Sequence, residues 1–99
     1  MSKSDEKRER LEKAYKVASR HYQRCLADLA EAKYNESNAN YALLINGGSE
    51  WEDIADKRHV KAENKRKKIE ERFKRYESIH LSALIRLQDY MESIGEPVA

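Results

Sequence analysis

Three side chains in the sequence have the types, and part of the spacing, that a metal site requires. His21 and Cys25 are four residues apart, which places them on one face of a helix. His80 would join them if two helices ran antiparallel, giving a His/Cys/His set of zinc ligands. A fourth ligand is missing, and pairs four residues apart arise by chance in long helices. We therefore interpret Cys25 and His80 as core residues and expect no metal and no cofactor.

The same cysteine and histidine are also the residue types of nucleophilic catalysis. Cys25 occupies a position that we expect to be buried, and burial raises the pKa of a thiol and blocks access to it. Arg66, Glu36 and Lys33 could form a charged site inside a bundle of two copies, but they match no catalytic motif. We expect no catalytic residues and a protein that is not an enzyme.

The composition is typical of long helices rather than of a mixed enzyme fold. Charged residues make up 38% of the 99 residues, against about 25% in an average globular domain. The 20 basic and 18 acidic residues leave a net charge of only +2, which argues against disorder. One Pro and three Gly are too few for a turn-rich β-sandwich or a Rossmann domain.

Targeting signals are not apparent in the sequence. No apolar run approaches the length of a membrane span, and the first 25 residues are too charged for a signal peptide. A single cysteine excludes an internal disulfide and suits a reducing compartment. We expect a cytoplasmic protein with no membrane association.

Glycines mark two interruptions in the helical pattern. Gly47 and Gly48 can close a helix, and Ser49 with Glu52 forms a capping box that starts the next one. Gly95, followed by Pro97, is typical of a second helix end. We therefore predict one helical-hairpin domain over 1–99, with a helix at 4–46, a turn at 47–49, a helix at 50–94 and a short C-terminal tail at 95–99.

Both predicted helices carry a seam of apolar and small residues at alternating spacings of four and three, which is typical of an antiparallel coiled coil. In an antiparallel register whose facing residue numbers sum to 98, large residues face small ones, as in the layer of Ala18 with His80. The same register places Asp28 opposite Arg72 and Lys33 opposite Glu63. The seam residues are Leu11, Tyr15, Ala18, Tyr22, Cys25, Leu29, Ala32, Glu36, Ala39 and Leu43, then Ala55, His59, Ala62, Arg66, Ile69, Phe73, Tyr76, His80, Ala83, Leu87, Tyr90 and Ile94.

The asparagine-rich segment 35–40 weakens this pattern. Asn35, Ser37, Asn38 and Asn40 are poor helix formers, and Glu36 puts a charge in the seam. The sequence leaves open whether the first helix is continuous through this segment or bends or breaks within it.

Apolar residues outside the seam indicate surfaces that a lone hairpin would leave in water. One group predicts self-association of two hairpins into a four-helix bundle, and it consists of Leu26, Leu81, Leu84, Ile85 and Met91. A second group surrounds the turn, where it either staples the turn or binds a partner, and it consists of Tyr41, Leu44, Trp51 and Ile54. The leading hypothesis is a non-enzymatic protein–protein interaction module, a small adaptor, inhibitor or chaperone-like hairpin that covers a surface of another protein.

A basic run is the basis of the alternative hypothesis, sequence-independent binding of nucleic acid. Ten Lys or Arg residues lie between Lys57 and Arg75, together with three acidic residues. Such a run can neutralise phosphates, although it lacks the aromatic residues of many nucleic-acid sites. A solvated, salt-bridged helix face is the simpler explanation of the run. The residues of this alternative are Lys57, Lys61, Lys65, Lys67, Lys68 and Lys74.

Overall fold

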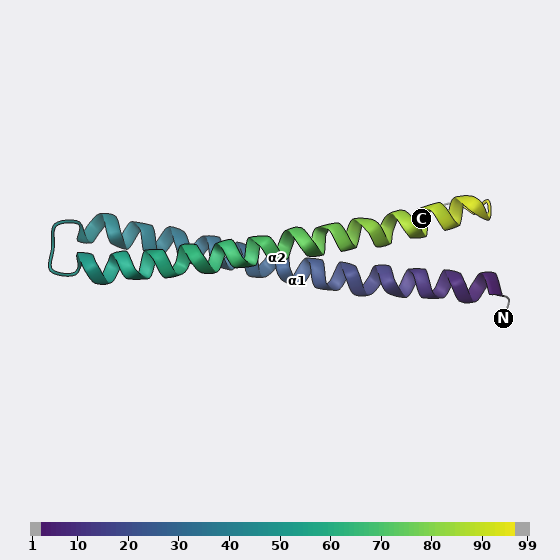
Figure 1. Ribbon diagram of the computed structural model, residues 1–99, viewed down its shortest axis with the longest axis horizontal. Coiled ribbons are helices and arrows are strands. Elements are labelled where there is room, and N and C mark those ends of the chain that lie inside the picture. Colours follow the sequence, from purple (N-terminus) through teal and green to yellow (C-terminus); the bar gives the residue numbers. More distant parts are fainter. Residues whose placement is uncertain (1–2, 97–99) are drawn as a thin grey trace. The chain divides into compact units, whose positions relative to one another are not determined.

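Two helices joined by a short turn make up the computed structural model, which describes residues 3–96 (Figure 1). Helix α1 spans Lys3–Asn46 and helix α2 spans Glu52–Ser93, so the predicted all-α hairpin is confirmed with its helix ends within two residues. The last three residues of the predicted tail lie outside the described part of the chain. Neither helix of the described chain combines the length and the apolarity needed to cross a membrane.

The turn is closed by the residues that the sequence singles out. Gly48 adopts the left-handed conformation with φ +79°, and the Ser49 hydroxyl accepts a hydrogen bond from the Trp51 amide at 3.2 Å. The Glu52 carboxylate reaches back to accept from the Gly48 amide at 3.2 Å. Because α2 begins at Glu52 instead of residue 50, this carboxylate bonds one residue earlier than in a standard capping box.

The end of α2 has the geometry of a Schellman motif. Gly95 is left-handed, with φ +74°. Its amide donates to the Glu92 carbonyl at 3.1 Å, and the Glu96 amide donates to the Met91 carbonyl at 3.0 Å. These two bonds satisfy carbonyls that the helix end would otherwise leave unpaired, so the predicted role of Gly95 is confirmed.

The chain divides into two compact units, each containing one stretch of both helices. Unit 1 comprises Met1–Arg24 and Lys74–Ala99, and unit 2 comprises Cys25–Phe73. The buried hydrophobic side chains of the described residues are few and mostly small: Ala18 and Met91 in unit 1, and Cys25, Leu29, Ala32 and Ala55 in unit 2.

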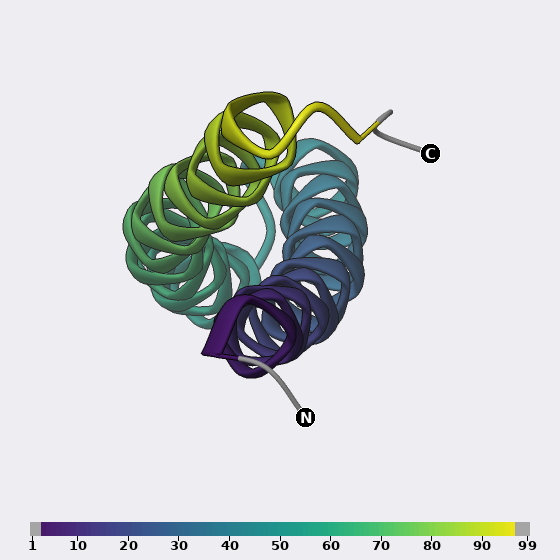
Figure 2. The same cartoon turned by 90° about the vertical axis from the view of Figure 1, so that its right-hand side faces the viewer.

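Helices α1 and α2 run antiparallel in unit 1 (Figure 2). An aromatic stack joins the two helices in this unit. The His80 ring lies between Tyr15 and Tyr22, with ring centroids 5.3 and 4.8 Å apart and nearly parallel planes. Ala18, which is midway between these two tyrosines on α1, is buried. The large-against-small layer of His80 with Ala18 therefore agrees with the predicted register.

Unit 2 contains a charged pair within its seam. Arg66 on α2 donates to the Glu36 carboxylate on α1 and also to Glu70 one turn along its own helix. Both members of the interhelical pair are half-buried, so each neutralises a charge that water reaches poorly.

Helix α1 is continuous through 35–40, which answers the question that the sequence leaves open for this segment. The polar residues Asn35, Ser37, Asn38 and Asn40 are all exposed and leave the buried face undisturbed. Their low helix propensities cost only a few tenths of a kcal/mol each. The packing of Ala32 on one side, and the pairing of Glu36 with Arg66, outweigh that cost.

The seam of α2 departs from the predicted one near its end. Met91 is only 6% exposed and Leu84 is half-buried, whereas the predicted seam residue Ile94 is exposed and lies beyond the helix. Met91 follows Phe73 by 18 residues, which is about five turns at 3.6 residues per turn, so both lie on the same face. A strict seven-residue repeat drifts about 20° per heptad from an ideal straight helix, which is why it misplaces Met91.

We predict that Gly48→Ala destabilises the hairpin through its backbone alone. A Cβ on Gly48 meets no atom within 4 Å, but its φ lies in the region that L-residues avoid, which costs roughly 1–2 kcal/mol. Urea denaturation followed by circular dichroism measures this loss. Gly47→Ala is the matched control, since a Cβ there makes ordinary contacts at 3.6 Å or more without a positive φ. Equal losses in both variants would contradict the backbone explanation.

Candidate protein-binding surface

The histidines and the cysteine that suggested a metal site have separate structural roles. His21 stacks on Tyr76 with ring centroids 5.7 Å apart, and His80 lies in the tyrosine stack of unit 1. Cys25 is buried, with its thiol 3.9 Å from the Ile69 carbonyl oxygen. Among residues 3–96, no three His, Cys, Asp or Glu side chains come together in a metal-binding group.

The thiol of Cys25 is in an environment that suppresses its reactivity. Burial raises its pKa, the nearby Arg72 guanidinium lowers it, and the Asp28 carboxylate raises it, with burial dominant. The thiolate is the nucleophilic form of cysteine, so a buried thiol with a raised pKa is chemically inert.

The charged residues that suggested a catalytic site do come together in unit 2. Lys33, Glu36 and Arg66 line one hollow, along with His59 and Glu70. Arg66 is already bound by two carboxylates, and its hydrogen bond to Glu36 is the main cause of its raised pKa. Its Nε and Nη1 groups are therefore already paired with carboxylates of the chain, which offset its positive charge.

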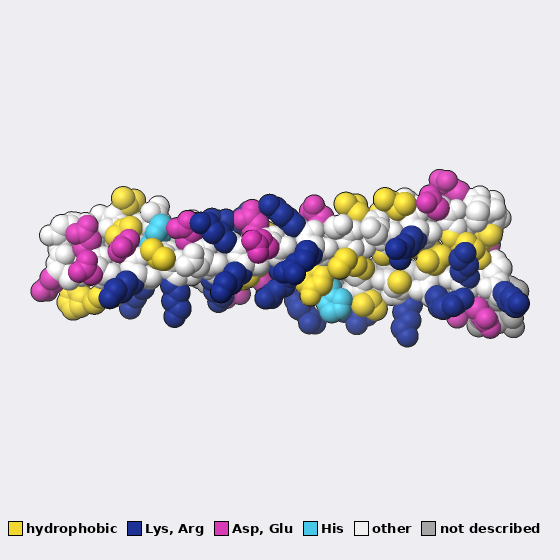
Figure 3. All heavy atoms as spheres, in the orientation of Figure 1, with side chains coloured by type: hydrophobic (Ala, Val, Ile, Leu, Met, Phe, Trp, Pro, Cys, Tyr) yellow, Lys and Arg dark blue, Asp and Glu magenta, His cyan; other side chains and the backbone are white. Residues whose placement is uncertain are grey.

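The apolar residues around the turn are the most exposed large hydrophobic group of unit 2. We define the turn-end cluster as Tyr41, Leu44, Ile45, Trp51 and Ile54. These side chains are 48–73% exposed, and Figure 3 shows hydrophobic side chains at the surface at the turn end of the chain. Side chains that stapled the turn would cover one another, so this degree of exposure favours the partner-binding interpretation over the staple.

The residues predicted for self-association are only partly at the surface. Leu26, Leu81 and Ile85 are exposed, but Leu84 is half-buried and Met91 is buried. The prediction that Met91 lies outside the two-helix core is therefore wrong, because its face of α2 turns into the core of unit 1. Leu81 and Ile85, four residues apart on α2, remain as the exposed apolar pair of unit 1 from this set.

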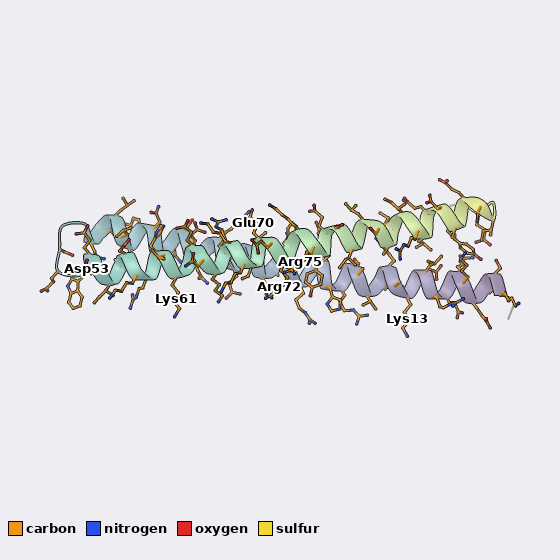
Figure 4. The ribbon with its side chains drawn as sticks, viewed as in Figure 1. Lys13, Asp53, Lys61, Glu70, Arg72 and Arg75 are labelled. Atoms are coloured by element: carbon orange, nitrogen blue, oxygen red, sulfur yellow. The ribbon has the colours of Figure 1, made fainter. Side chains whose placement is uncertain are left out.

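Basic residues form a stripe along α2 in unit 2. Lys57, Lys61, Lys65, Lys68 and Arg72 are exposed and recur every three or four residues, so they share a helix face; Figure 4 shows Lys61 pointing away from α2. A count of charges between Lys57 and Arg75 does not identify this stripe. It is recognised only when the residues are placed on a helix.

Acidic residues accompany much of the basic run. Lys65, Lys68 and Arg72 line a hollow shared with Asp28 and Glu31 of α1, which agrees with the predicted facing of Asp28 and Arg72. Elsewhere, Lys67 pairs with Glu63 on its own helix at 2.9 Å. The hydrogen bond from Lys67 is the main cause of the lowered pKa of Glu63.

An apolar groove in unit 1 is a surface that the sequence analysis did not identify. It is lined on α1 by Ala14, Val17 and Ala18 and on α2 by Ile79, among others. The available signal was the sequence Ala14-x-x-Val17-Ala18, which widens the apolar face of α1 beyond the seam. A predicted two-helix seam gives the residues between the helices, but it does not predict which neighbouring apolar residues stay exposed to solvent.

We predict that Cys25 reacts slowly with a thiol reagent such as DTNB until unit 2 unfolds. Its burial and raised pKa slow the reaction by at least about 100-fold relative to an exposed thiol. The absorbance of the released thiolate measures the rate, and urea should accelerate it. The double variant Cys25→Ala/Ala27→Cys, with its thiol at an exposed position, is the control. Equally fast labelling of both proteins would show that Cys25 is accessible.

Comparison with known proteins adds no family to this picture. No protein-family model matches the chain, and neither the curated proteins nor the solved structures contain a significant match. The function must therefore be argued from the residues of the chain itself.

Proposed function

We propose that this protein is a non-enzymatic protein-binding module that covers a surface of a partner protein with its turn-end cluster. The observation that supports the proposal is the exposure of all five large apolar side chains of the cluster, at 48–73%. Burial of apolar surface contributes about 25 cal/mol per Å², so a partner that covers them gains several kcal/mol. A small adaptor, an inhibitor and a chaperone-like hairpin would all use such a surface.

The chemistry of the cluster suits a protein interface. Trp and Tyr are frequent hot-spot residues because they bury large area with few rotatable bonds. Tyr41 and Leu44 are held by α1, and Ile54 is held by α2, so these anchors are presented on regular helices with little conformational freedom to lose.

The charges beside the cluster define the partner further. Glu50, Asp53 and Asp56 are exposed next to Trp51 and Ile54 in the sequence, and Asp53 is labelled in Figure 4. These carboxylates would oppose Lys or Arg side chains around an apolar pocket on the partner. Such complementary charges raise the rate of association and exclude wrong partners.

Self-association and location are parts of the same proposal. The exposed pair Leu81 and Ile85 on α2 is the remaining candidate contact for a homodimer that buries apolar surface as a four-helix bundle. A single free, buried cysteine suits the reducing environment of the cytoplasm.

We predict that Leu44→Glu and Trp51→Ala each remove partner binding without unfolding the hairpin. Both side chains are more than half exposed, so the thermal unfolding monitored by circular dichroism should change by only a few degrees. Quantitative mass spectrometry of proteins retained from a nuclease-treated extract of the native host should show one stoichiometric partner, depleted at least tenfold for each variant. Val60→Glu, an exposed apolar-to-acidic change on α2 outside the cluster, is the control and should retain that partner. A partner retained equally by every variant would overturn the assignment of the cluster.

The basic stripe supports a second candidate function, sequence-independent binding of nucleic acid. Its five exposed cations share one face of a continuous helix, and none of them has an ion pair within 4.0 Å among the described residues. Asp28 and Glu31 border the same face and weaken its positive potential, which is why this function ranks second.

The nucleic-acid alternative predicts a steep salt dependence. If all five cations contact phosphates, log Kd against log salt should have a slope of about 4 to 5 for duplex DNA, measured by fluorescence anisotropy of a labelled 20-mer. Lys61→Glu with Lys68→Glu should then abolish binding, whereas Lys33→Glu on α1 should have a smaller effect. Weak binding with a slope near one would exclude this function.

A further inference from the structure

Unit 1 contains an open apolar groove between α1 and α2 that no part of the described chain fills. It has a volume of about 490 Å³, and a second hollow of about 360 Å³ extends it along the unit. The two hollows share Ala14, Ala18 and Ile79. Figure 3 shows hydrophobic side chains gathered over this unit beside a histidine, with Lys and Arg side chains around them.

The walls of the groove combine small and branched apolar side chains. Val17 on α1 and Ile79 on α2 are 40% and 54% exposed and stand at its sides. Ala14, Ala18 and Ala83 leave space between them, because an alanine side chain ends at Cβ. A third helix can approach two packed helices along such a groove, at the usual 8–10 Å between axes.

The groove has a cationic rim on both sides. Arg10 and Lys13 border it on α1 and Arg86 borders it on α2, and all three are exposed; Figure 4 shows Lys13 extending away from α1. Within residues 3–96 none of the three lies within 4.0 Å of a carboxylate, in contrast to Arg8, which pairs with Glu12 and Glu96.

No acidic residue of the described chain lines the groove. Glu6 and Glu9 share a neighbouring surface hollow with Arg10 and Lys13 but form no ion pair with them among the described residues. The side chains around the two groove hollows are otherwise neutral or basic, with His21 at one end. The groove is therefore apolar inside and positive along both edges.

We propose that this groove binds an amphipathic helix of a partner protein, one that carries carboxylates on both sides of its apolar stripe. The apolar residues of such a helix recur at i, i+3, i+4 and i+7 and would fit between Val17 and Ile79. Its carboxylates would meet Arg10 and Lys13 at one edge and Arg86 at the other. This surface lies in unit 1 and is separate from the turn-end cluster of unit 2.

The charge of the rim favours an acidic helix of a partner protein over a second copy of the chain, and the apolar floor favours it over nucleic acid. A second copy docked groove to groove would bring the cationic rims together, and like charges across an interface are unfavourable. Nucleic acid would be attracted to the rim but would leave the apolar floor unused. It would also find Tyr76 already stacked on His21 instead of free to stack on a base.

The test uses two 18-residue helical probe peptides with the same Leu/Ala stripe, one flanked by Glu and one flanked by Lys. Fluorescence anisotropy at 150 mM salt should show that the full chain binds the Glu peptide at least tenfold more tightly than the Lys peptide. Ile79→Glu should abolish this binding, whereas Val60→Glu, a similar change at an exposed apolar residue of α2 outside the groove, should leave it intact. Arg10→Glu combined with Arg86→Glu should reverse the preference toward the Lys peptide.

Other outcomes would overturn the proposal. Equal affinity for the two peptides would show that the charges at the rim do not determine binding. Unchanged binding by Ile79→Glu would show that the peptide does not bind in the groove. A dimer in analytical ultracentrifugation that Ile79→Glu converts to a monomer would make a second copy the occupant. Leu44→Glu should leave peptide binding unchanged, so the outcome here is independent of the outcome for the turn-end cluster. Circular dichroism of each variant establishes that it is folded.

Discussion

Close approach of α1 and α2 through small side chains is the interaction on which both units depend. The described chain buries Ala18, Cys25, Ala32 and Ala55 almost completely, with Leu29 and Met91 as the only large hydrophobic residues among the buried ones. A core built from two helices has one layer of contact, so each helix can bury only a narrow stripe of its surface. The small residues let the two helices approach closely, and larger apolar side chains remain at the surface.

Polar residues in the seam are accommodated by pairing or stacking. Glu36 and Arg66 neutralise each other across unit 2, and His80 lies between two tyrosine rings in unit 1. Removing one partner of such an ion pair is costly, because it leaves the other charge without its counter-charge. Each pairing forms in only one register of the two helices. A shift of one helix along the other would separate Arg66 from Glu36 and His80 from its two tyrosines.

The two surfaces proposed for binding differ in shape and in charge. The turn-end cluster projects large side chains next to Glu50, Asp53 and Asp56, whereas the groove of unit 1 recedes between helices and has Arg10, Lys13 and Arg86 at its edges. If both proposals hold, the two surfaces would select different partners, since each needs the opposite shape and charge. Both are available because each unit has more large apolar side chains than its two-helix core covers.

Local signals in the sequence determined the helices, the turn and nearly all of the seam. Glycines at 48 and 95 mark helix ends because those positions need a left-handed backbone, and the four-three repeat marks the buried face because a helix has near-constant periodicity. Tertiary structure decided the rest. Met91 enters the core because a helix near 3.6 residues per turn drifts from a seven-residue repeat, and α1 stays intact through 35–40 because Arg66, thirty residues away from Glu36, supplies its counter-charge. The groove of unit 1 forms because the two helices are rotated so that Val17 and Ile79 stand at its sides. That rotation is set by packing between residues that are distant in the sequence.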